Sequence, residues 1–577
     1  MMISSRRELL RLAALTGAGA IAGCARNEAA AAEEPPANGI TPQTVAEAEK
    51  LQGISFTPAE RALMIEDVEG SLETLAALRA MEMPNHLAPA LTFDPKLPRK
   101  RTPSQKNTLS LSPVARAAPK SEDDLAFASV VELSAWLRAG AVTSAQLTEL
   151  YLKRIAAHDG KLNAFITVTP DLAREQAAKA DADLREGRDR GPLHGIPYAM
   201  KDLADTKDVR TTWGAAPFKD RVPDDDAEAV RKLRLAGAVL LGKTACGAIA
   251  WGDQWFGAKT RNPWNPEEGS SGSSAGSASA VAAGLCAFAI GTETYGSIIS
   301  PSERCGTTGL RPTFGRVSRA GFMALCWSLD KVGAICRSVE DTAAVLSQIN
   351  GYDADDPGAA RMGFAYEAMP DVSKMTVGYV PQWFDQGDET DRKALQTLRD
   401  LGVTLKEFSW PQIDYRTLTA IVLVESAAAF AELTLSNRDD ELVSQGKNAW
   451  PNTWRGARFV SAVDYIQIDR LRRRCMEEIG AAFEGFDALI GPNFAGGALL
   501  ATNATGHPQL ILRAGYSQRP AKLGEGNEHG EGRATFRAPR GVSLWGDLFG
   551  EGKIIALGAV MERELGVASG RPPGFST

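Results

Sequence analysis

A block rich in glycine and serine, residues 269–316, constrains the fold of this chain more than any other segment. Glycine and serine without an apolar pattern are typical of a flexible linker. Here the serine-rich part runs directly into an apolar stretch, Ala278 to Ile290, and a second glycine–serine turn follows at Gly296 and Ser297. Two turns joined by a packed helix and strand can hold two hydroxyls at a fixed separation. The block therefore predicts a site and not a tether.

Composition narrows the choice of partners. The 577 residues include 44% hydrophobic and 23% charged residues, which is typical of a globular protein. The formal net charge of −7 argues against nucleic acid as a partner, because phosphate binding needs a basic face. The five histidines do not pair with one another or with cysteine at ligand spacing. We therefore expect neither a metal centre nor another cofactor.

The N-terminus carries the features of an export signal. Arg6 and Arg7 precede a short, weakly apolar run that ends in Ile21-Ala22-Gly23-Cys24. The run is too short to span a bilayer, and paired arginines in this setting are typical of a twin-arginine signal. Its end resembles a bacterial lipobox, in which Cys24 would be lipidated; the alternative is a cleaved signal with an incidental cysteine. We predict an exported protein, periplasmic or anchored to the membrane only through that lipid.

The chain divides into three segments. We assign residues 1–24 to the signal, 25–120 to a tether, a helical N-terminal segment and a linker, and 121–570 to one large domain. Two helices are expected in the second segment, because Thr41 and Thr57 each stand as an N-cap before a proline.

From residue 129 onward, helical and strand patterns alternate. Ser129 and Thr143 open capping boxes, each before a run with helical apolar spacing. Short apolar segments between the helices predict strands at 164–168, 238–241, 287–290, 375–379 and 488–490. We predict an α/β fold: a large mixed, mostly parallel twisted sheet, covered by helices on both faces and preceded by the small helical segment.

Three elements supply candidate catalytic groups. Lys201 ends an apolar stretch, and a poorly solvated lysine has a lowered pKa and can act as a base. Residues 272–277 form a turn of hydroxyls. Residues 292–297 present Ser297 behind backbone N–H groups that can face a developing oxyanion.

These elements resemble the amidase signature family of serine hydrolases. The resemblance covers most of residues 124–565 and rests on several ordered motifs: GPLHGIP…KD at 191–202, the serine-rich loop, GTETYGSI at 291–298, CG…GLRPT…GRVSR at 305–319 and NATGHP at 503–508. It implies the amidase signature fold, with the 121–570 domain as the catalytic domain. It also implies hydrolysis of a linear small-molecule or peptide amide through an acyl-enzyme, by a monomer or a homodimer.

The same resemblance implies a Ser–Ser–Lys triad. Ser297 would be the nucleophile, Ser273 the bridging serine and Lys201 the base, with a cis peptide bond between Gly272 and Ser273. The oxyanion would be held by backbone N–H groups of the second turn, those of Thr294, Tyr295, Gly296 and Ser297.

The chain departs from the common family pattern in two places. Tyr295 stands where many members have glycine, and its backbone N–H stays usable if its φ is negative. Ile299 stands where many members have arginine, which removes a charge near the turn. Both departures bear on the substrate more than on the reaction.

Alternative functions remain open at this point. Residues 272–276 also match G-x-S-x-G, which would make Ser274 the nucleophile, but residues 262–268 cannot supply the apolar strand that this motif needs. An exported, non-catalytic binding lipoprotein and an esterase using the same triad are further readings. The tRNA-dependent amidotransferase has a catalytic component, its A subunit, in the same family, but the export signal and the acidic balance argue against that role.

The sequence says less about the substrate. Trp450, Trp454, Phe459 and Tyr465 lie in the region that lines the acyl pocket in this family, or they are simply core residues. The polar, glycine-rich segment 516–540 predicts a surface loop near the edge of the sheet.

Overall fold

The computed structural model describes residues 39–575 apart from 82, 99, 101, 103, 116, 369 and 523–533. The chain forms two compact units, Met1–Glu82 and Met83–Thr577. The predicted export signal and Cys24 lie outside the described residues. None of the helices in the described part combines the length and the apolar character needed to cross a membrane.

The first unit contains the predicted helical segment. Helices α2 (Pro42–Gln52) and α3 (Pro58–Leu63) begin at Thr41 and Thr57, whose side chains close capping boxes in front of a proline. Helix α4 (Ile65–Arg79) follows directly. The second predicted helix is thus divided at Met64, whose side chain has no oxygen with which to cap α4.

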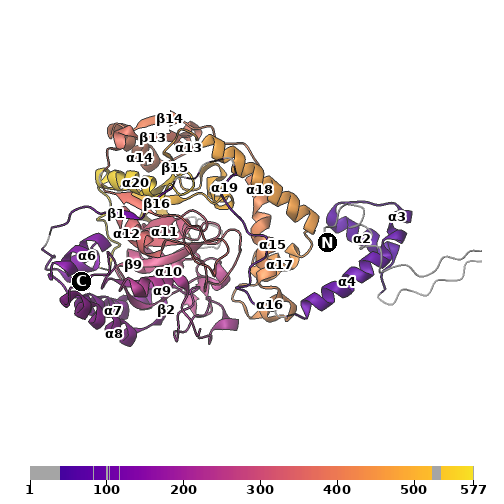
Figure 1. Ribbon diagram of the computed structural model, residues 1–577, viewed down its shortest axis with the longest axis horizontal. Coiled ribbons are helices and arrows are strands. Elements are labelled where there is room, and N and C mark those ends of the chain that lie inside the picture. The colour runs from indigo at the N-terminus through magenta and orange to yellow at the C-terminus, as the bar shows by residue number, and fades with distance from the viewer. Residues whose placement is uncertain are drawn as a thin grey trace, which may run out of the picture. The chain divides into compact units, whose positions relative to one another are not determined.

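An eleven-stranded sheet forms the centre of the second unit in the part of the chain that the structure describes (Figure 1). Its strands in spatial order are β14 (Thr404–Glu407), β13 (Thr376–Tyr379), β15 (Ala488–Pro492), β17 (Thr535–Trp545), β16 (Gln509–Pro520), β10 (Thr308–Arg311), β11 (Lys331–Cys336), β9 (Phe288–Glu293), β3 (Pro197–Lys201), β4 (Val239–Thr244) and β2 (Phe165–Val168). The five strands predicted from apolar segments are β2, β4, β9, β13 and β15.

The large mixed sheet is confirmed, but the prediction that it is mostly parallel is wrong. Parallel pairs join β14, β13 and β15 at one end and β9, β3 and β4 at the other. The other six of the ten described pairs are antiparallel, including every pair from β15 through β17, β16, β10 and β11 to β9. A buried strand reads as an apolar run whichever way its neighbour runs, so direction was not visible in the sequence.

Helices cover both faces of the sheet, as two neighbouring residues of β16 show. Gly558 of α20 (Glu551–Leu565) packs so closely on Leu510 that an added Cβ would lie 2.7 Å from the leucine side chain. Ile511, by contrast, packs in a buried cluster with Ile299 of α11 (Ile299–Cys305) and Leu499 of α19 (Ala498–Thr505). Since successive side chains of a strand point to opposite faces, α20 lies on one face and α11 on the other.

The helices of the second unit are α5 (Glu122–Ala126), α6 (Val130–Arg138), α7 (Ser144–Leu162), α8 (Pro170–Arg185), α9 (Glu228–Leu235), α10 (Ala275–Ala282), α11 (Ile299–Cys305), α12 (Val339–Ile349), α13 (Pro381–Asp385), α14 (Glu389–Asp400), α15 (Thr419–Ala429), α16 (Ala431–Leu435), α17 (Trp450–Ala457), α18 (Ala462–Ala482), α19 (Ala498–Thr505) and α20 (Glu551–Leu565). The predicted capping boxes at Ser129 and Thr143 open α6 and α7.

Within the second unit, its first residues, 83–120, pack along the rest of the unit. Lys100 forms an ion pair with Asp547 at 2.7 Å. Strand β1 (Thr108–Ser110) pairs with β12 (Ala365–Glu367). Two further small sheets join β5 (Gln254–Trp255) to β6 (Ala258–Lys259) and β7 (Arg261–Asn262) to β8 (Asn265–Gly269).

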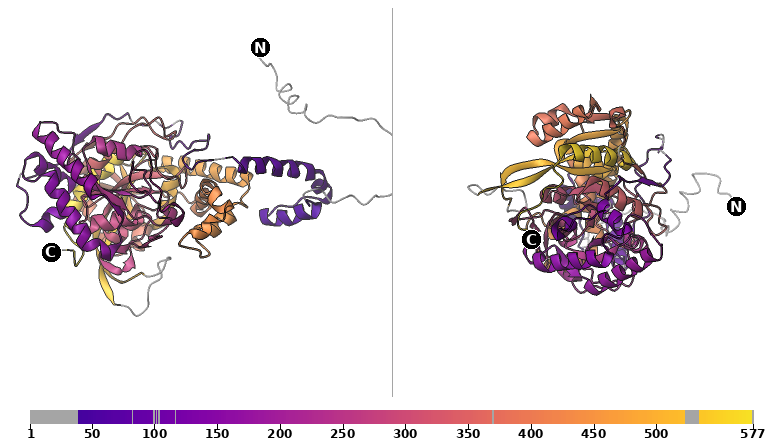
Figure 2. Two further views of the ribbon diagram at one scale, coloured as in Figure 1. Left: turned by 90° about the horizontal axis from the view of Figure 1, so that it is seen from below. Right: turned by 90° about the vertical axis from the view of Figure 1, so that its left-hand side faces the viewer.

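Residues 516–540 are not a simple loop at the edge of the sheet. Strands β16 and β17 continue as a hairpin to Pro520 and Thr535, and both lie in the interior of the strand order. Figure 2 shows the paired ends of this hairpin (yellow) extending from the body of the unit. Only residues 523–533 of the predicted loop lie outside the described residues.

Candidate active site

The fold places the three candidate elements at one edge of the sheet. Lys201 ends β3, and the second turn begins directly after β9, which lies parallel to β3. The carboxyl ends of parallel neighbours meet at the same edge, where α/β sheets form their sites. The serine-rich turn leads into α10 at this edge, and the backbone N–H of Ser274 donates to the carbonyl oxygen of Ser297 at 3.1 Å.

Lys201 is fully buried and surrounded by hydroxyls. Its Nζ lies 2.8 Å from Ser273 Oγ, 3.0 Å from Ser274 Oγ and 2.8 Å from Thr292 Oγ1. No carboxylate forms an ion pair with this ammonium group among the described residues. Burial lowers the pKa of Lys201 to about 8, against the opposing effect of the charges of Asp330 and Glu293. A shift of that size means that burial disfavours the ammonium form by about 3 kcal/mol.

Ser273 and Ser297 line one cavity of about 300 Å³, the candidate catalytic cavity. The peptide bond between Gly272 and Ser273 is cis, as the resemblance implied. Ser273 is the partner of Lys201, whereas no hydrogen bond to the Ser297 hydroxyl is found within the described part of the chain. Catalytic hydrogen bonds commonly tighten only when substrate is bound. The cavity therefore exposes Ser273 and Ser297 together, while Lys201 does not line it and reaches it only through its hydrogen bond to Ser273.

The second turn presents a row of unoccupied donors. Among the described residues, no acceptor is found for the backbone N–H groups of Thr294, Tyr295, Gly296 or Ser297. Gly296 has a φ of 91°, in the left-handed region, while Tyr295 is not among the residues of positive φ. The backbone N–H of Tyr295 therefore stays usable, as the sequence required. Successive free N–H groups beside a serine can stabilise an oxyanion.

Two buried carboxylates fix this turn from behind. Glu293 Oε2 accepts the backbone N–H groups of Ile298 and Ile299 at 2.8 and 3.0 Å, while Oε1 accepts from Arg311 and Asn503 at 2.9 and 2.8 Å. Burial opposes ionisation of Glu293, but Arg311 and these hydrogen bonds hold its pKa below the usual value. Asp330 in turn accepts the Thr294 hydroxyl at 2.5 Å.

Ile299 is a core residue and not part of the cavity. It is fully buried with Leu499 and Ile511, and it begins α11 directly after the second turn. The charge that the family often carries here is replaced by apolar packing.

Ser274 is badly placed to act as a nucleophile. It is fully buried; its Oγ donates to the Thr292 carbonyl at 3.1 Å and accepts the Thr292 N–H at 3.2 Å. A short strand, β8, does precede the serine-rich turn, but it is polar and pairs only with β7 outside the central sheet. The G-x-S-x-G motif therefore lacks the strand and the exposed hydroxyl that it needs.

The aromatic residues proposed for the acyl pocket have different environments. Trp450 lines the catalytic cavity and packs edge-to-face on Trp251, with ring centroids 4.9 Å apart. Trp454 is a core residue stacked on Trp450, while Phe459 is exposed. Tyr465 lines a separate cavity and donates to Glu425. Only Trp450 contributes to the catalytic cavity, and Trp251 was missed in the sequence.

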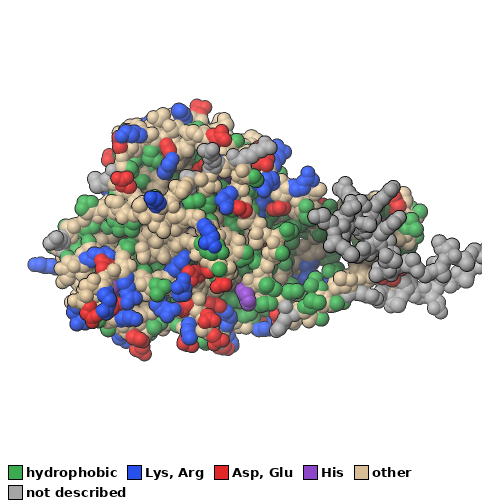
Figure 3. Space-filling model, in the orientation of Figure 1, with side chains coloured by type: hydrophobic (Ala, Val, Ile, Leu, Met, Phe, Trp, Pro, Cys, Tyr) green, Lys and Arg blue, Asp and Glu red, His purple; other side chains and the backbone are tan. Residues whose placement is uncertain are grey.

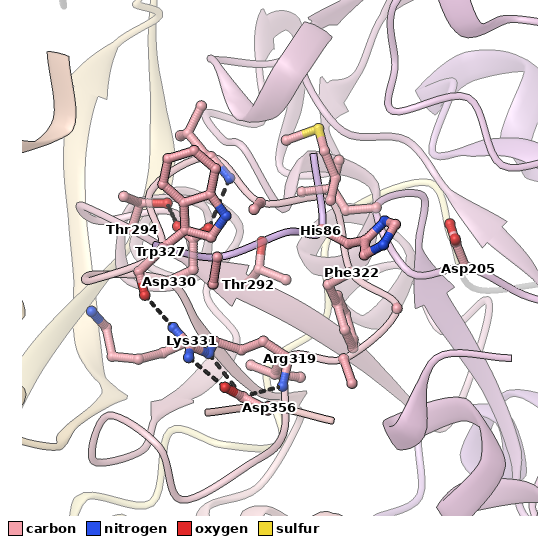
Figure 4. A pocket seen from close by; sticks show the side chains of 18 of the residues that line it. His86, Asp205, Thr292, Thr294, Arg319, Phe322, Trp327, Asp330, Lys331 and Asp356 are labelled. Atoms are coloured by element: carbon pink, nitrogen blue, oxygen red, sulfur yellow. Dashed lines mark hydrogen bonds and ion pairs between the residues drawn. The ribbon is translucent and has the colours of Figure 1, made fainter. Parts of the chain in front are cut away.

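A second cavity of about 270 Å³ adjoins the catalytic one, because both are lined by Ala250, Thr294 and Leu325. In Figure 4, Thr292, Thr294 and Trp327 lie at one side of it and His86 and Asp205 at the other. Apolar side chains such as Phe322 and Met323 line much of its wall. An extended substrate would therefore have space on this side of the second turn.

The described residues contain no cluster of three or more His, Cys, Asp or Glu side chains suited to a metal ion. The groups gathered at the cavity are instead hydroxyls, a lysine amine and backbone N–H groups. Such a set is suited to acyl transfer through a serine nucleophile. The fold and the site together fit a hydrolase of α/β architecture.

Comparisons with known proteins identify the family to which this chain belongs. Residues 146–514 match the Amidase family. The chain is 33% identical over 471 residues to the A subunit of glutamyl-tRNA(Gln) amidotransferase from Geotalea daltonii, covering 75% of this chain and 96% of that protein. The corresponding protein from Thermosynechococcus vestitus is 33% identical over 417 residues, covering 66% and 86%. The crystal structure of native peptide amidase from Stenotrophomonas maltophilia matches with a TM-score of 0.66 at 31% identity, covering 78% of this chain and 99% of that one.

The chain belongs to the amidase family and has the amidase signature fold. It is an enzyme that acts on amide carbon–nitrogen bonds.

Proposed function

We propose that this enzyme hydrolyses linear carboxylic amides through an acyl-enzyme on Ser297, with Ser273 as proton relay and Lys201 as base. The observation that carries the proposal is the 2.8 Å contact between the buried Lys201 amine and Ser273 Oγ, inside the cavity that Ser297 also lines. A lysine without a carboxylate partner gives up its proton readily when it is buried, and a neutral amine is the form that can act as a base.

The reaction follows from these positions. The Ser297 hydroxyl passes its proton to Ser273, and Ser273 passes its own to neutral Lys201, while Ser297 Oγ bonds to the amide carbon. The carbonyl electron pair moves onto oxygen, where the free N–H groups of Thr294, Tyr295 and Gly296 stabilise it. The relay then protonates the amine, the C–N bond breaks, and water cleaves the ester on Ser297 by the same route.

The substrate that we propose is a small-molecule or peptide amide. The likeness to a peptide amidase supports a substrate of that size, as does the second cavity beside the nucleophile turn. A tRNA substrate, which the names of other relatives suggest, fits less well with a net charge of −7. On the face seen in Figure 3, lysine and arginine are interspersed with acidic side chains. Export, and the lipid on Cys24, remain proposals from the first 24 residues.

Labelling with a fluorophosphonate tests the nucleophile. We expect one adduct per chain, mapped by mass spectrometry of tryptic peptides to Ser297, together with turnover of a neutral anilide or a C-terminally amidated peptide. An adduct on Ser274 would support the G-x-S-x-G reading instead. Unlabelled protein that binds amides without cleaving them would support a binding scaffold, and cleavage of esters alone would identify an esterase.

The pH dependence tests the base. With an uncharged anilide, kcat/KM should rise about tenfold per pH unit up to pH 8 and then level off, because only neutral Lys201 can accept a proton and its pKa is about 8. The sign follows from the lowered pKa: raising the pH through it creates the active form. Initial rates between pH 5.5 and 10 measure this limb, and a profile that falls or stays flat over the range contradicts the assignment.

A further inference from the structure

A third cavity, of about 380 Å³, adjoins the catalytic one on the other side. Both cavities are lined by Ser271, Tyr295 and Arg304. The remaining wall comes from α11, from residues around α19 and from the β16–β17 hairpin, and its polar residues include Ser300, Glu303, Arg519, Lys522 and Arg540. Four cationic side chains therefore face one acidic side chain in this wall.

The carboxylates near the third cavity are already occupied. Glu268 binds the guanidinium of Arg519 through both oxygens, at 2.8 and 2.9 Å. Glu303 Oε1 accepts from Arg540 at 2.8 Å, and its Oε2 accepts from Asn493 and from the backbone N–H of Gly541, both at 2.7 Å. These carboxylates leave little capacity for another cation.

Lys522 is the cation of this wall for which the described residues supply no ion-pair contact. Its backbone N–H donates to Glu268 at 2.7 Å, but its ammonium group has neither an ion pair nor a hydrogen bond among the described residues. Burial and the charges of Arg304 and Arg519 lower its pKa to about 8, against the opposing effect of Glu303. A half-buried ammonium group crowded by guanidinium groups is stabilised by any anion that enters the cavity.

We propose that the third cavity is an anion subsite, so that the preferred substrate is an amide carrying a carboxylate or a similar anionic group near the scissile bond. This inference rests on the proposed amide hydrolysis at Ser297. Tyr295 lies on the wall shared by the two cavities, so the substrate passes its ring to reach Lys522. The departure of this chain from its family at position 295 thus falls at the entrance to the subsite.

Matched substrate pairs test the subsite. One pair consists of the 4-nitroanilides of glutaric acid and of its monomethyl ester, which differ in charge on the acyl side. The other consists of acetanilides with a carboxylate or its methyl ester on the ring, which differ on the amine side. At pH 7 we expect the anionic member of one pair to have a kcat/KM about tenfold higher than its ester, mainly through KM. The pair that responds identifies the side of the substrate that enters the cavity.

Lys522→Met should remove that preference while leaving the neutral members within about twofold. Lys522→Gln gives the same result if the methionine variant folds poorly. Lys553→Met is the matched control, because Lys553 pairs with Asp487 and lines neither cavity. Esters that match or outperform both acids, or a preference that survives Lys522→Met, would overturn the proposal.

Binding to the Ser297→Ala protein separates this inference from the proposed function. Isothermal titration of both pairs needs no turnover, so an anionic preference that disappears in Ser297→Ala/Lys522→Met supports the subsite even if no amide is cleaved. Equal binding of acid and ester overturns the subsite even if Ser297 proves to be the nucleophile.

Discussion

Ser297→Ala is expected to lower kcat/KM for amide hydrolysis by roughly 10⁴-fold or more, with no loss of fold. In the proposed mechanism the alanine removes the oxygen that bonds to the substrate carbon, and losing the nucleophile of a serine hydrolase costs about as much as losing the whole triad. The backbone N–H groups of the turn remain, so the residual rate is that of oxyanion stabilisation alone. Initial rates on the best amide of the screen, beside thermal unfolding of both proteins, measure the effect.

The matched control for this substitution is Ser373→Ala. Ser373 is exposed, its hydroxyl binds Asp371, and it lines none of the cavities near the nucleophile. It should retain wild-type activity. Undiminished hydrolysis by Ser297→Ala would refute the proposed triad.

Lys201→Met is expected to lower kcat/KM by about 10³-fold and to abolish the rising limb of the pH profile below pH 8. Stability should not fall, because the buried ammonium of Lys201 has hydroxyl partners and no described carboxylate to leave unpaired. Removing a charge that burial disfavours by about 3 kcal/mol can even raise the unfolding temperature. Activity and melting temperature are then expected to change in different directions.

Lys243→Met provides the comparison. Lys243 is equally buried on the neighbouring strand β4, but its Nζ lies 3.5 Å from Asp202 Oδ1. Breaking a buried ion pair by removing one partner costs about 3–5 kcal/mol. This variant should therefore unfold at a lower temperature than Lys201→Met. If Lys201→Met keeps wild-type kcat/KM, Lys201 is not the base.

Much of the fold could be predicted from local patterns. Capping boxes at Ser129 and Thr143 mark helix starts that the structure confirms, since the cap satisfies N–H groups whatever surrounds the helix. The antiparallel centre of the sheet was missed because β10 and the first half of β17 lack apolar runs, and because the apolar runs of the other strands do not show strand direction. Strand β10 is Thr308-Gly309-Leu310-Arg311, and β17 includes Arg537, Pro539 and Arg540.

The candidate site likewise contains residues that could be predicted from the sequence and residues that could not. Lys201, Ser273 and Ser297 were predicted from ordered motifs, and the structure places both serines on one cavity and Lys201 at hydrogen-bond distance from Ser273. Asp330 behind Thr294 and Lys522 in the third cavity were not, because each comes from an element distant in the sequence with no motif of its own. Their positions depend on how β11 and the β16–β17 hairpin pair with the rest of the sheet.

The network around Glu293 sets a lower limit on the size of a working enzyme. All three proposed catalytic residues lie within positions 201–297, which would suggest that a short fragment is enough for activity. Yet the carboxylate that holds the start of α11 takes one of its hydrogen bonds from Asn503, near the far end of the chain. A fragment that ended between β15 and Asn503 would leave Glu293 without one of its donors. It would also lack β16 and β17, and so would expose β10 and β15 as new sheet edges. Recombination between relatives should therefore exchange the stretches around 293 and 503 together.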